Sequence, residues 1–505
     1  MELSLGNEKL SYAEHILTEN LSAEETMEMI VPDALPDILR IVHADAEVMV
    51  REKDADSGRV TVRGIARAYV LYSPEDNSSV RRVAVEVPYS LSAADPRITA
   101  DARVTARIGA LKVEANAANP RKVSVRVSIA AQLGCYRESS AEIPTAPESD
   151  DEDIELLSAS SELSLPTDVR EKTFVITDEY ALPNANAPIA EILSCRTEIV
   201  PEEPKIVGSK LIFKGVAHTD LLYATPDGEI APASLQSEFS QIIELEGASA
   251  ESEFELIPLL TGSYIEPIFE SGSTAKRVSI EIHAVGQVVA VSKRKISYVA
   301  DAYGTKFEVT PVNAAISFEN RKKLEPTSTV LRGVLPASGV SRIISVSSRA
   351  GSAENNAAGT EFVIPVYVSA LYISGDGQPL SASGKFEVKG SLPGANAGVT
   401  AQIGRDAYGA AGDGGIEIRV PVEICVTVNS TLGLNPVSAL TLDEDTNANV
   451  SGAPSLVIAR ARKNDTLWSV AKRYRATPDL VSDTNSLDDD AKLSEGAMLV
   501  IPRKR

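Results

Sequence analysis

The stretch Gly64-Ile-Ala-Arg-Ala-Tyr-Val-Leu-Tyr72 recurs as Gly215-Val-Ala-His-Thr-Asp-Leu-Leu-Tyr223, 151 residues further along the chain. A weaker third copy, Ile364-Pro-Val-Tyr-Val-Ser-Ala-Leu-Tyr372, follows after a further 149 residues. Each copy is followed by an aspartate and then Asn or Gly, residues that supply the positive φ of a tight hairpin. These dipeptides are Asp76-Asn77, Asp227-Gly228 and Asp376-Gly377. A repeated strand and turn predicts three related domains.

A second repeated stretch has the alternation of a half-buried strand. In Lys122-Val-Ser-Val-Arg-Val127 the valines share one face, and Arg277–Ile282 and Gly415–Val420 show the same pattern. Two short motifs also recur, namely Leu-Pro pairs ahead of short apolar segments and the tetrapeptide Asp-Ala-Tyr-Gly. They are Leu35-Pro36, Leu182-Pro183, Leu335-Pro336, Asp301-Ala-Tyr-Gly304 and Asp406-Ala-Tyr-Gly409. We therefore predict a mainly β protein of three tandem repeated domains, each a sandwich or an open barrel.

Two polar segments are interpreted as linkers. The first contains Pro144, Pro147 and the acidic run Glu148–Asp153, a composition too polar to pack. The second would tether the last module loosely to the body. The predicted domains are 1–142 (β repeat 1), 143–172 (acidic linker), 173–319 (β repeat 2), 320–434 (β repeat 3, divergent), 435–455 (linker) and 456–505 (terminal module).

Charge restricts the classes of partner. The chain of 505 residues has a formal net charge of −22. Residues 456–505 hold ten Lys and Arg against seven Asp and Glu, so this tail carries +3 and the rest −25. Nucleic acid binding needs a basic face, so we expect no nucleic acid partner for the body.

Cysteine usage and motif searches bear on compartment and chemistry. The three cysteines, Cys135, Cys195 and Cys425, are far apart in sequence and suit a reducing compartment. We find no signal peptide and no apolar run long enough for a membrane span, which predicts a cytoplasmic protein. The histidines form no metal-spaced pair and no phosphate-binding loop is present, so we expect no catalytic residues, no metal and no cofactor. Only the chain's size leaves room for an enzyme.

The terminal segment follows the order strand, helix, helix, strand. Leu456–Ala461 and Leu499–Ile501 are apolar and strand-like. Thr466 precedes residues that are apolar at helical spacing, and Thr477 precedes Pro478 at the start of a second short helix that stops at Asn485.

This segment resembles a LysM module. Asn464-Asp-Thr-Leu-Trp468 stands where that family carries Gly-Asp-Thr-Leu-Trp, and Asn is the residue after Gly that best tolerates positive φ. The resemblance implies a shallow groove for peptidoglycan or N-acetylglucosamine polymers. Its residues would be Asn464, Asp465, Thr466 and Leu467 on one side and Asn485, Ser486 and Leu487 on the other. The residues that would form the structural core are Trp468, Ala471, Tyr474, Leu480 and Ile501.

Two further interpretations of the terminal segment stay open. Asp465 and Thr466 can cap the first helix while Trp468 fills the core, and a small module of this kind can also bind a protein.

The repeated β units ahead of one terminal LysM resemble a family of clostridial spore-coat morphogenetic proteins. The resemblance implies a non-enzymatic assembly scaffold in the mother-cell cytoplasm. Its LysM would dock onto the ATPase of the coat basement layer at the forespore surface. The alternative function is that of a glycan-binding protein that uses the LysM groove.

Overall fold

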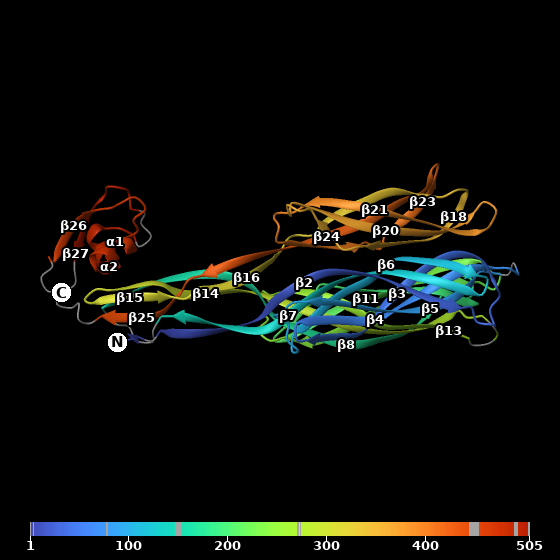
Figure 1. Cartoon of the computed structure of the whole chain (residues 1–505), viewed down its shortest axis with the longest axis horizontal. Helices are drawn as coiled ribbons and strands as arrows, with labels where there is room; N and C mark the ends of the chain where they lie inside the picture. Colours follow the sequence, from blue (N-terminus) through green and yellow to red (C-terminus); the bar gives the residue numbers. More distant parts are fainter. Residues whose placement is uncertain are drawn as a thin grey trace.

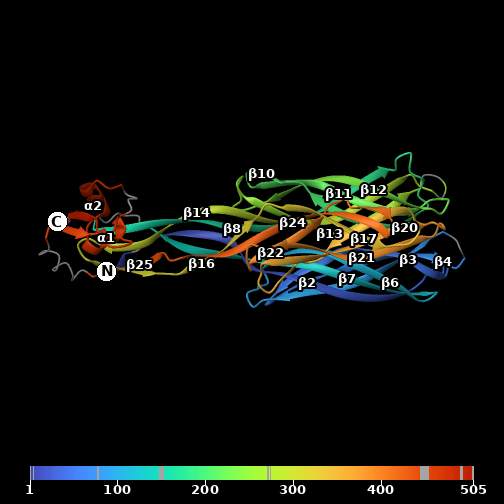
Figure 2. The ribbon, with the colours of Figure 1, turned by 90° about the horizontal axis from the view of Figure 1, so that it is seen from above.

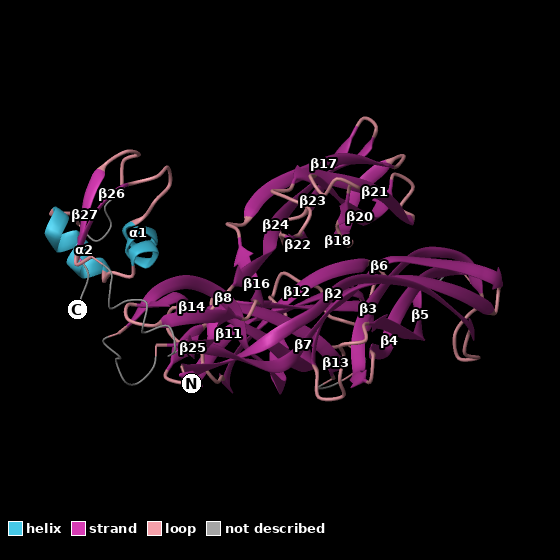
Figure 3. Ribbon diagram, turned by 60° about the vertical axis from the view of Figure 1, so that its left-hand side comes forward, coloured by secondary structure: helices cyan, strands magenta, loops and turns pink. Residues whose placement is uncertain are grey.

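The computed structural model describes residues 2–3, 5–76, 79–146, 153–269, 272, 274–443, 454–488 and 493–502. It is elongated, with a broad body of strands that narrows into a stalk, and a small module lies at the stalk end (Figure 1). The mainly β fold is confirmed. Within the described residues only α1 (Leu467–Tyr474) and α2 (Pro478–Asn485) are α-helices, and both belong to the terminal module (Figure 3).

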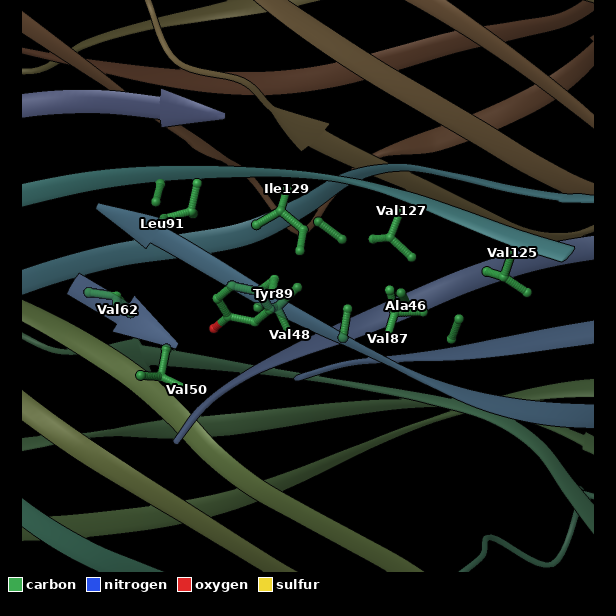
Figure 4. Close-up of a cluster of buried hydrophobic side chains, with 14 of the residues drawn as sticks. Ala46, Val48, Val50, Val62, Val87, Tyr89, Leu91, Val125, Val127 and Ile129 are labelled. Atoms are coloured by element: carbon green, nitrogen blue, oxygen red, sulfur yellow. The ribbon is translucent and has the colours of Figure 1, made fainter. Parts of the chain in front are cut away.

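The first β unit is a sandwich of two three-stranded antiparallel sheets. Alternating side chains from the facing strands fill the space between the sheets (Figure 4). The predicted alternation is confirmed, because Val123, Val125, Val127 and Ile129 are all fully buried. One sheet has the order β2-β7-β6 and the other β3-β4-β5. The strands are β2 (Gly6–Ile30), β3 (Ile38–Asp56), β4 (Arg59–Pro74), β5 (Arg81–Ala94), β6 (Arg103–Asn119) and β7 (Lys122–Thr145).

The second unit repeats this arrangement with the orders β13-β14-β8 and β9-β11-β12, and β10 is added beside β11. Its strands are β8 (Ile154–Ala181), β9 (Glu191–Pro201), β10 (Lys205–Val207), β11 (Lys210–Ala224), β12 (Ile230–Glu244), β13 (Glu253–Ile268) and β14 (Arg277–Gly304).

In the third unit the first and fifth strands are each broken in two, and all four pieces pair with the last strand, β24. Its strands are β16 (Ile316–Lys323), β17 (Thr327–Pro336), β18 (Val340–Ala350), β19 (Glu354–Asn355), β20 (Glu361–Ser374), β21 (Pro379–Ser391), β22 (Ala397–Ile403), β23 (Tyr408–Gly412) and β24 (Gly415–Leu434).

The repeated nonapeptides form the central strands β4, β11 and β20. The Tyr72 hydroxyl donates to the Pro36 carbonyl at 3.0 Å, and the Tyr223 hydroxyl donates to the Ala187 carbonyl at 3.1 Å. These bonds show that residues 151 apart are equivalent. The match of Leu35-Pro36 with Leu182-Pro183 is therefore wrong by four residues. The true counterpart of Leu182-Pro183 is Val31-Pro32.

The third copy differs for a reason of packing. Gly64 lies opposite Tyr89, whose ring occupies the space that a side chain at Gly64 would need. Gly215 is covered in the same way by Phe239. In the third unit Ile364 faces Val388, so an aliphatic pair replaces the glycine and aromatic pair.

Both predicted linkers are wrong over the residues that the structure describes. From Ile154 to residue 172 the chain is part of β8, which pairs with β14 and buries Leu163 and Leu165. The alternation of Leu with Ser and Glu from residue 161 is a strand signal that the neighbouring acidic run obscured. In the second segment, β25 (Val437–Asp443) pairs with β15 (Glu308–Asn313) and β1 (Glu2–Leu3). Residues 147–152 and 444–453 lie outside the described part.

The two Asp-Ala-Tyr-Gly motifs are not structurally equivalent. Asp301–Gly304 ends β14, the last strand of its unit, whereas Asp406–Gly409 leads into β23, ahead of the last strand of the third unit. Neither supports the repeat, although the first is important for the position of the terminal module.

The three units surround a common axis. Leu71, Leu222 and Leu371, which occupy the same place in the repeated strand, meet in one buried cluster. Val42, Leu193 and Ile344, which are also equivalent, belong to the same cluster.

Beyond the body, the first and last strands of each unit continue as antiparallel pairs, and the three pairs lie side by side in the stalk (Figures 1 and 2). The stalk core takes at least one large side chain from each unit, including Leu10, Leu163 and Phe318.

Candidate functional site

The terminal module has the predicted order of strand, helix, helix and strand. β26 (Leu456–Arg460) pairs antiparallel with β27 (Met498–Pro502), and α1 and α2 connect them. The Thr466 hydroxyl accepts from the Ser469 amide at 3.1 Å, which caps α1. Thr477 stands at the start of α2 without a side-chain capping bond. Asn464 has a φ of 66°, the positive value that the family's glycine would supply.

Two of the polar residues in the predicted groove are engaged within the module. The Asp465 carboxylate pairs with Arg473 and accepts from the Arg462 amide at 2.8 Å, and these bonds lower its pKa to about 2. The Asn485 side chain donates to the Val500 carbonyl at 2.6 Å and accepts from the Val500 amide at 2.7 Å, which joins α2 to β27. These side chains stabilise the module.

The other groove residues divide between core and surface. Leu467 is buried and Leu487 half-buried, and both join the module's apolar cluster. Asn464, Thr466 and Ser486 are exposed. A ligand on these loops would therefore meet mainly Asn464, Thr466 and Ser486.

The predicted core residues are partly in place. Ala471 and Ile501 are fully buried, whereas Tyr474 and Leu480 are half-buried. Trp468 is also half-buried, and its indole N–H donates to Asp301 at the stalk tip at 2.9 Å.

Sequence reasoning missed this contact between the module and the stalk. Tyr303, two residues after Asp301 in β14, is only 4% exposed and belongs to the module's apolar cluster. Arg475 lies 3.6 Å from Glu308 at the same junction. The sequence signal that could have indicated this contact is charge, because a basic module that follows an acidic body is attracted to it.

The outer face of the module's sheet is apolar and open. Leu456, Ile458 and Met498 are 53%, 62% and 61% exposed. They project from the side opposite the buried residues Ala459 and Leu499, because successive side chains of a strand point to opposite faces. Arg460, which pairs with Met498 across the sheet, adds a positive charge to this outer sheet face.

The body contains a second candidate site, a cleft of about 1140 Å³ lined by all three units. Equivalent stretches of β3, β9 and β18, which are edge strands in the described sheets, form much of its wall. Two arginines in the wall pair with acidic residues of other units. Arg349 contacts Asp45, and Arg405 lies 3.0 Å from Glu198 and 2.9 Å from Asp220.

Glu47 is a buried carboxyl of the cleft wall. It is 3% exposed and accepts from the Thr197 amide at 2.7 Å, while its second oxygen has no hydrogen-bond partner among the residues that the structure describes. Burial raises its pKa to about 6, against an ordinary value of 4.5. The carboxyl therefore keeps its proton to higher pH in the folded chain than in the unfolded chain.

The cysteines and possible metal ligands give little support for chemistry. Burial raises the pKa of Cys135 to about 11 and that of Cys195 to about 12, so neither thiol is activated. In the part of the chain that the structure describes, no three His, Cys, Asp or Glu side chains are grouped to hold a metal ion. Across that same part, no helix is long and apolar enough to cross a membrane.

We predict that Thr466→Ala lowers the stability of the module by about 1 kcal/mol, because α1 loses its capping bond. Thr477→Ala is the matched control, since Thr477 makes no such bond. Thermal unfolding of the full chain, followed by the fluorescence of its single tryptophan, measures both variants. Equal losses in the two variants would show that the capping bond contributes nothing measurable.

We predict that the free energy of unfolding falls as pH rises from 4.5 to about 6, because Glu47 ionises in the unfolded chain but keeps its proton in the buried wall of the cleft. The difference in pKa corresponds to about 2 kcal/mol of unfolding free energy. Glu47→Gln keeps the shape of the side chain and removes its ionisation. The difference in unfolding free energy between the variant and the native chain should therefore increase by about that amount from pH 4.5 to pH 7.5. Urea unfolding at both pH values tests this, and a constant difference would contradict it.

Comparison with known proteins identifies both parts of the chain. The model of the SipL SPOCS domain matches residues 37–117 and again 188–261, which fall in the first and second β units. The LysM domain model matches residues 460–502. No curated protein and no solved structure matches the chain. The chain is therefore a sporulation-related protein in which SPOCS domains of the SipL type precede a module of the peptidoglycan-binding LysM type.

Proposed function

We propose that the chain is a non-enzymatic assembly scaffold of the spore coat. In this account its LysM module docks onto a protein of the coat basement layer, the ATPase that coats the forespore. The scaffold would act in the mother-cell cytoplasm, at the forespore surface. The combination of SPOCS and LysM domains supports a role in sporulation, and the surface of the module supports a protein as its partner.

The exposed apolar sheet face is the observation that carries this proposal. Leu456, Ile458 and Met498 together make an apolar surface on a small module, and Arg460 gives it a positive charge. Such a surface suits a protein with apolar side chains and an acidic rim, because apolar burial provides affinity and charge provides orientation.

Peptidoglycan or another N-acetylglucosamine polymer is the second candidate ligand. Its support is the LysM match together with the exposed Asn464, Thr466 and Ser486 on the two loops. The bonds that hold Asp465 and Asn485 within the module leave fewer polar groups for sugar hydroxyls. For this reason we favour the protein partner.

An assembly role also suits the body. Its three sandwiches are joined through shared apolar clusters and ion pairs between units, such as Arg405 with Glu198. Such a joined body can hold bound partners at fixed spacing. Its negative charge favours basic protein partners over nucleic acid.

We predict that Ile458→Asp abolishes binding to the purified basement-layer ATPase, because a charge replaces an apolar side chain at the centre of the interface. Ile242→Asp is the matched control, since Ile242 is 51% exposed on a strand of the body. Pull-down of the ATPase with each full-length variant gives the readout. Undiminished capture by a folded Ile458→Asp chain would contradict the proposed sheet face.

The glycan alternative is tested on the same chains. Calorimetric titration with chitooligosaccharide should show no binding if the protein partner alone is correct. Binding that Ser486→Trp removes and Ile458→Asp preserves would instead support the groove.

A further inference from the structure

Asp301 at the stalk tip collects hydrogen bonds from the LysM module. Its carboxylate accepts from the Trp468 indole N–H at 2.9 Å and from the Lys472 ammonium at 2.5 and 2.6 Å. It also accepts from the Ala302 amide at 2.9 Å, which orients it within its own strand. Bonds between ionised groups are stronger than neutral ones, and this carboxylate is only 28% exposed.

Tyr303, two residues along the same strand, makes the apolar half of the junction. Its ring meets Trp468 edge to face, with the ring centres 4.8 Å apart and the planes at 65°. Its hydroxyl donates to the Ala476 carbonyl at 2.6 Å. Ala476 follows the left-handed residue Arg475 that ends α1, so the stalk contacts both the side and the end of this helix.

We propose that Asp301 and Tyr303 form a latch that holds the LysM module on the stalk in one orientation. The stalk then occupies the α1 face of the module, and a binding partner has access only to the outer sheet face and the loops. The statement about partners rests on the function proposed above, whereas the latch itself does not.

Charge favours a closed latch. Burial raises the pKa of Asp301, but the bonds from Lys472 and Trp468 outweigh it and leave the pKa below its ordinary value. The carboxylate is therefore ionised at neutral pH and attracts the basic module. The pair of Arg475 with Glu308 adds a second attraction at the same junction.

The chain contains its own control for the latch. Asp406 and Tyr408 repeat the Asp-Ala-Tyr-Gly motif in the third unit, where Tyr408 is 49% exposed. Among the contacts of the described residues, only the copy of the motif at the stalk tip meets the module. The same substitutions at the two motifs change the composition of the chain identically, but only those at Asp301 and Tyr303 remove the proposed contact.

Trp468 is the only tryptophan of the chain, so its fluorescence reports directly on the latch. In the full chain, Asp301→Ala and Tyr303→Ala should shift its emission to the red and increase its quenching by acrylamide, because the indole loses its cover. Asp406→Ala and Tyr408→Ala should leave both quantities at native values. Unchanged emission and quenching in the two stalk variants would overturn the proposal.

A charge exchange separates a lost contact from misfolding. Lys472→Asp alone should expose Trp468, and the combination of Asp301→Lys with Lys472→Asp should restore part of the protection. Failure of the double variant to recover any protection, while its melting curve stays native, would contradict a direct pair.

The partner measurement is kept apart from the latch measurement. An Asp301→Ala chain with an open latch should still capture the basement-layer ATPase through Ile458. Loss of capture in that folded chain would overturn the assignment of the α1 face to the stalk. Capture absent from every variant, with the fluorescence results as expected, would sink the proposed function and leave the latch standing.

Discussion

The antiparallel pairing of the first and last strands of each β unit is the constraint on which the structure depends. In the second unit this pairing runs from Ile154 opposite Gly304 to Ala181 opposite Arg277. Such a ladder brings the two ends of a unit together and extends them beyond its sandwich. Three such ladders side by side form the stalk. Together they bury apolar side chains that a single pair of strands would leave exposed to water. The position of the LysM module at one end of the molecule follows from this arrangement (Figures 1 and 2).

Contacts between equivalent strands of the second sheet of each sandwich explain how three units form one body. The faces that meet at the axis carry equivalent residues, so Leu71, Leu222 and Leu371 share one cluster. Polar contacts then fix the third unit against the other two, with Arg349 on Asp45 and Arg405 on Asp220. The SPOCS matches fall in the first two units, but the strand order of the third is the same once its broken strands are joined. Its aliphatic pair at Ile364 explains why its sequence departs from the other copies.

Much of this fold could be predicted from short patterns. The repeated strand around Tyr72 and the alternation around Val125 identify the sandwich strands because period and turn chemistry are local properties. The helix start at Thr466 and the turn at Asn464 are local as well. The stalk was missed because the apolar residues of β8 are sparse, and a strand with few of them is stable only when other strands cover it. The role of Asp301 was missed because its partner Trp468 lies 167 residues away, and short sequence patterns report only on local neighbours.

The sequence directs attention to the terminal module, but it does not show which of the module's residues also stabilise it. Asp465 and Asn485, which the LysM resemblance places in the groove, also hold the module together. The exposed surface lies on Ile458 and its neighbours, which a sequence pattern describes only as a short apolar strand. Whether a strand residue faces the core or the solvent depends on which face the helices cover, and that requires the tertiary structure.

Hydrogen exchange of the backbone amides in the full chain tests the central claim most directly. The claim is that residues 154–166 are a paired strand of a stalk and not a solvated linker. The account predicts that these amides are protected nearly as well as those of Val123–Ile129 in the first sandwich, since both lie in antiparallel ladders. Exchange at the rate of an unfolded peptide across residues 154–166 would contradict the stalk and remove the support on which the LysM module rests.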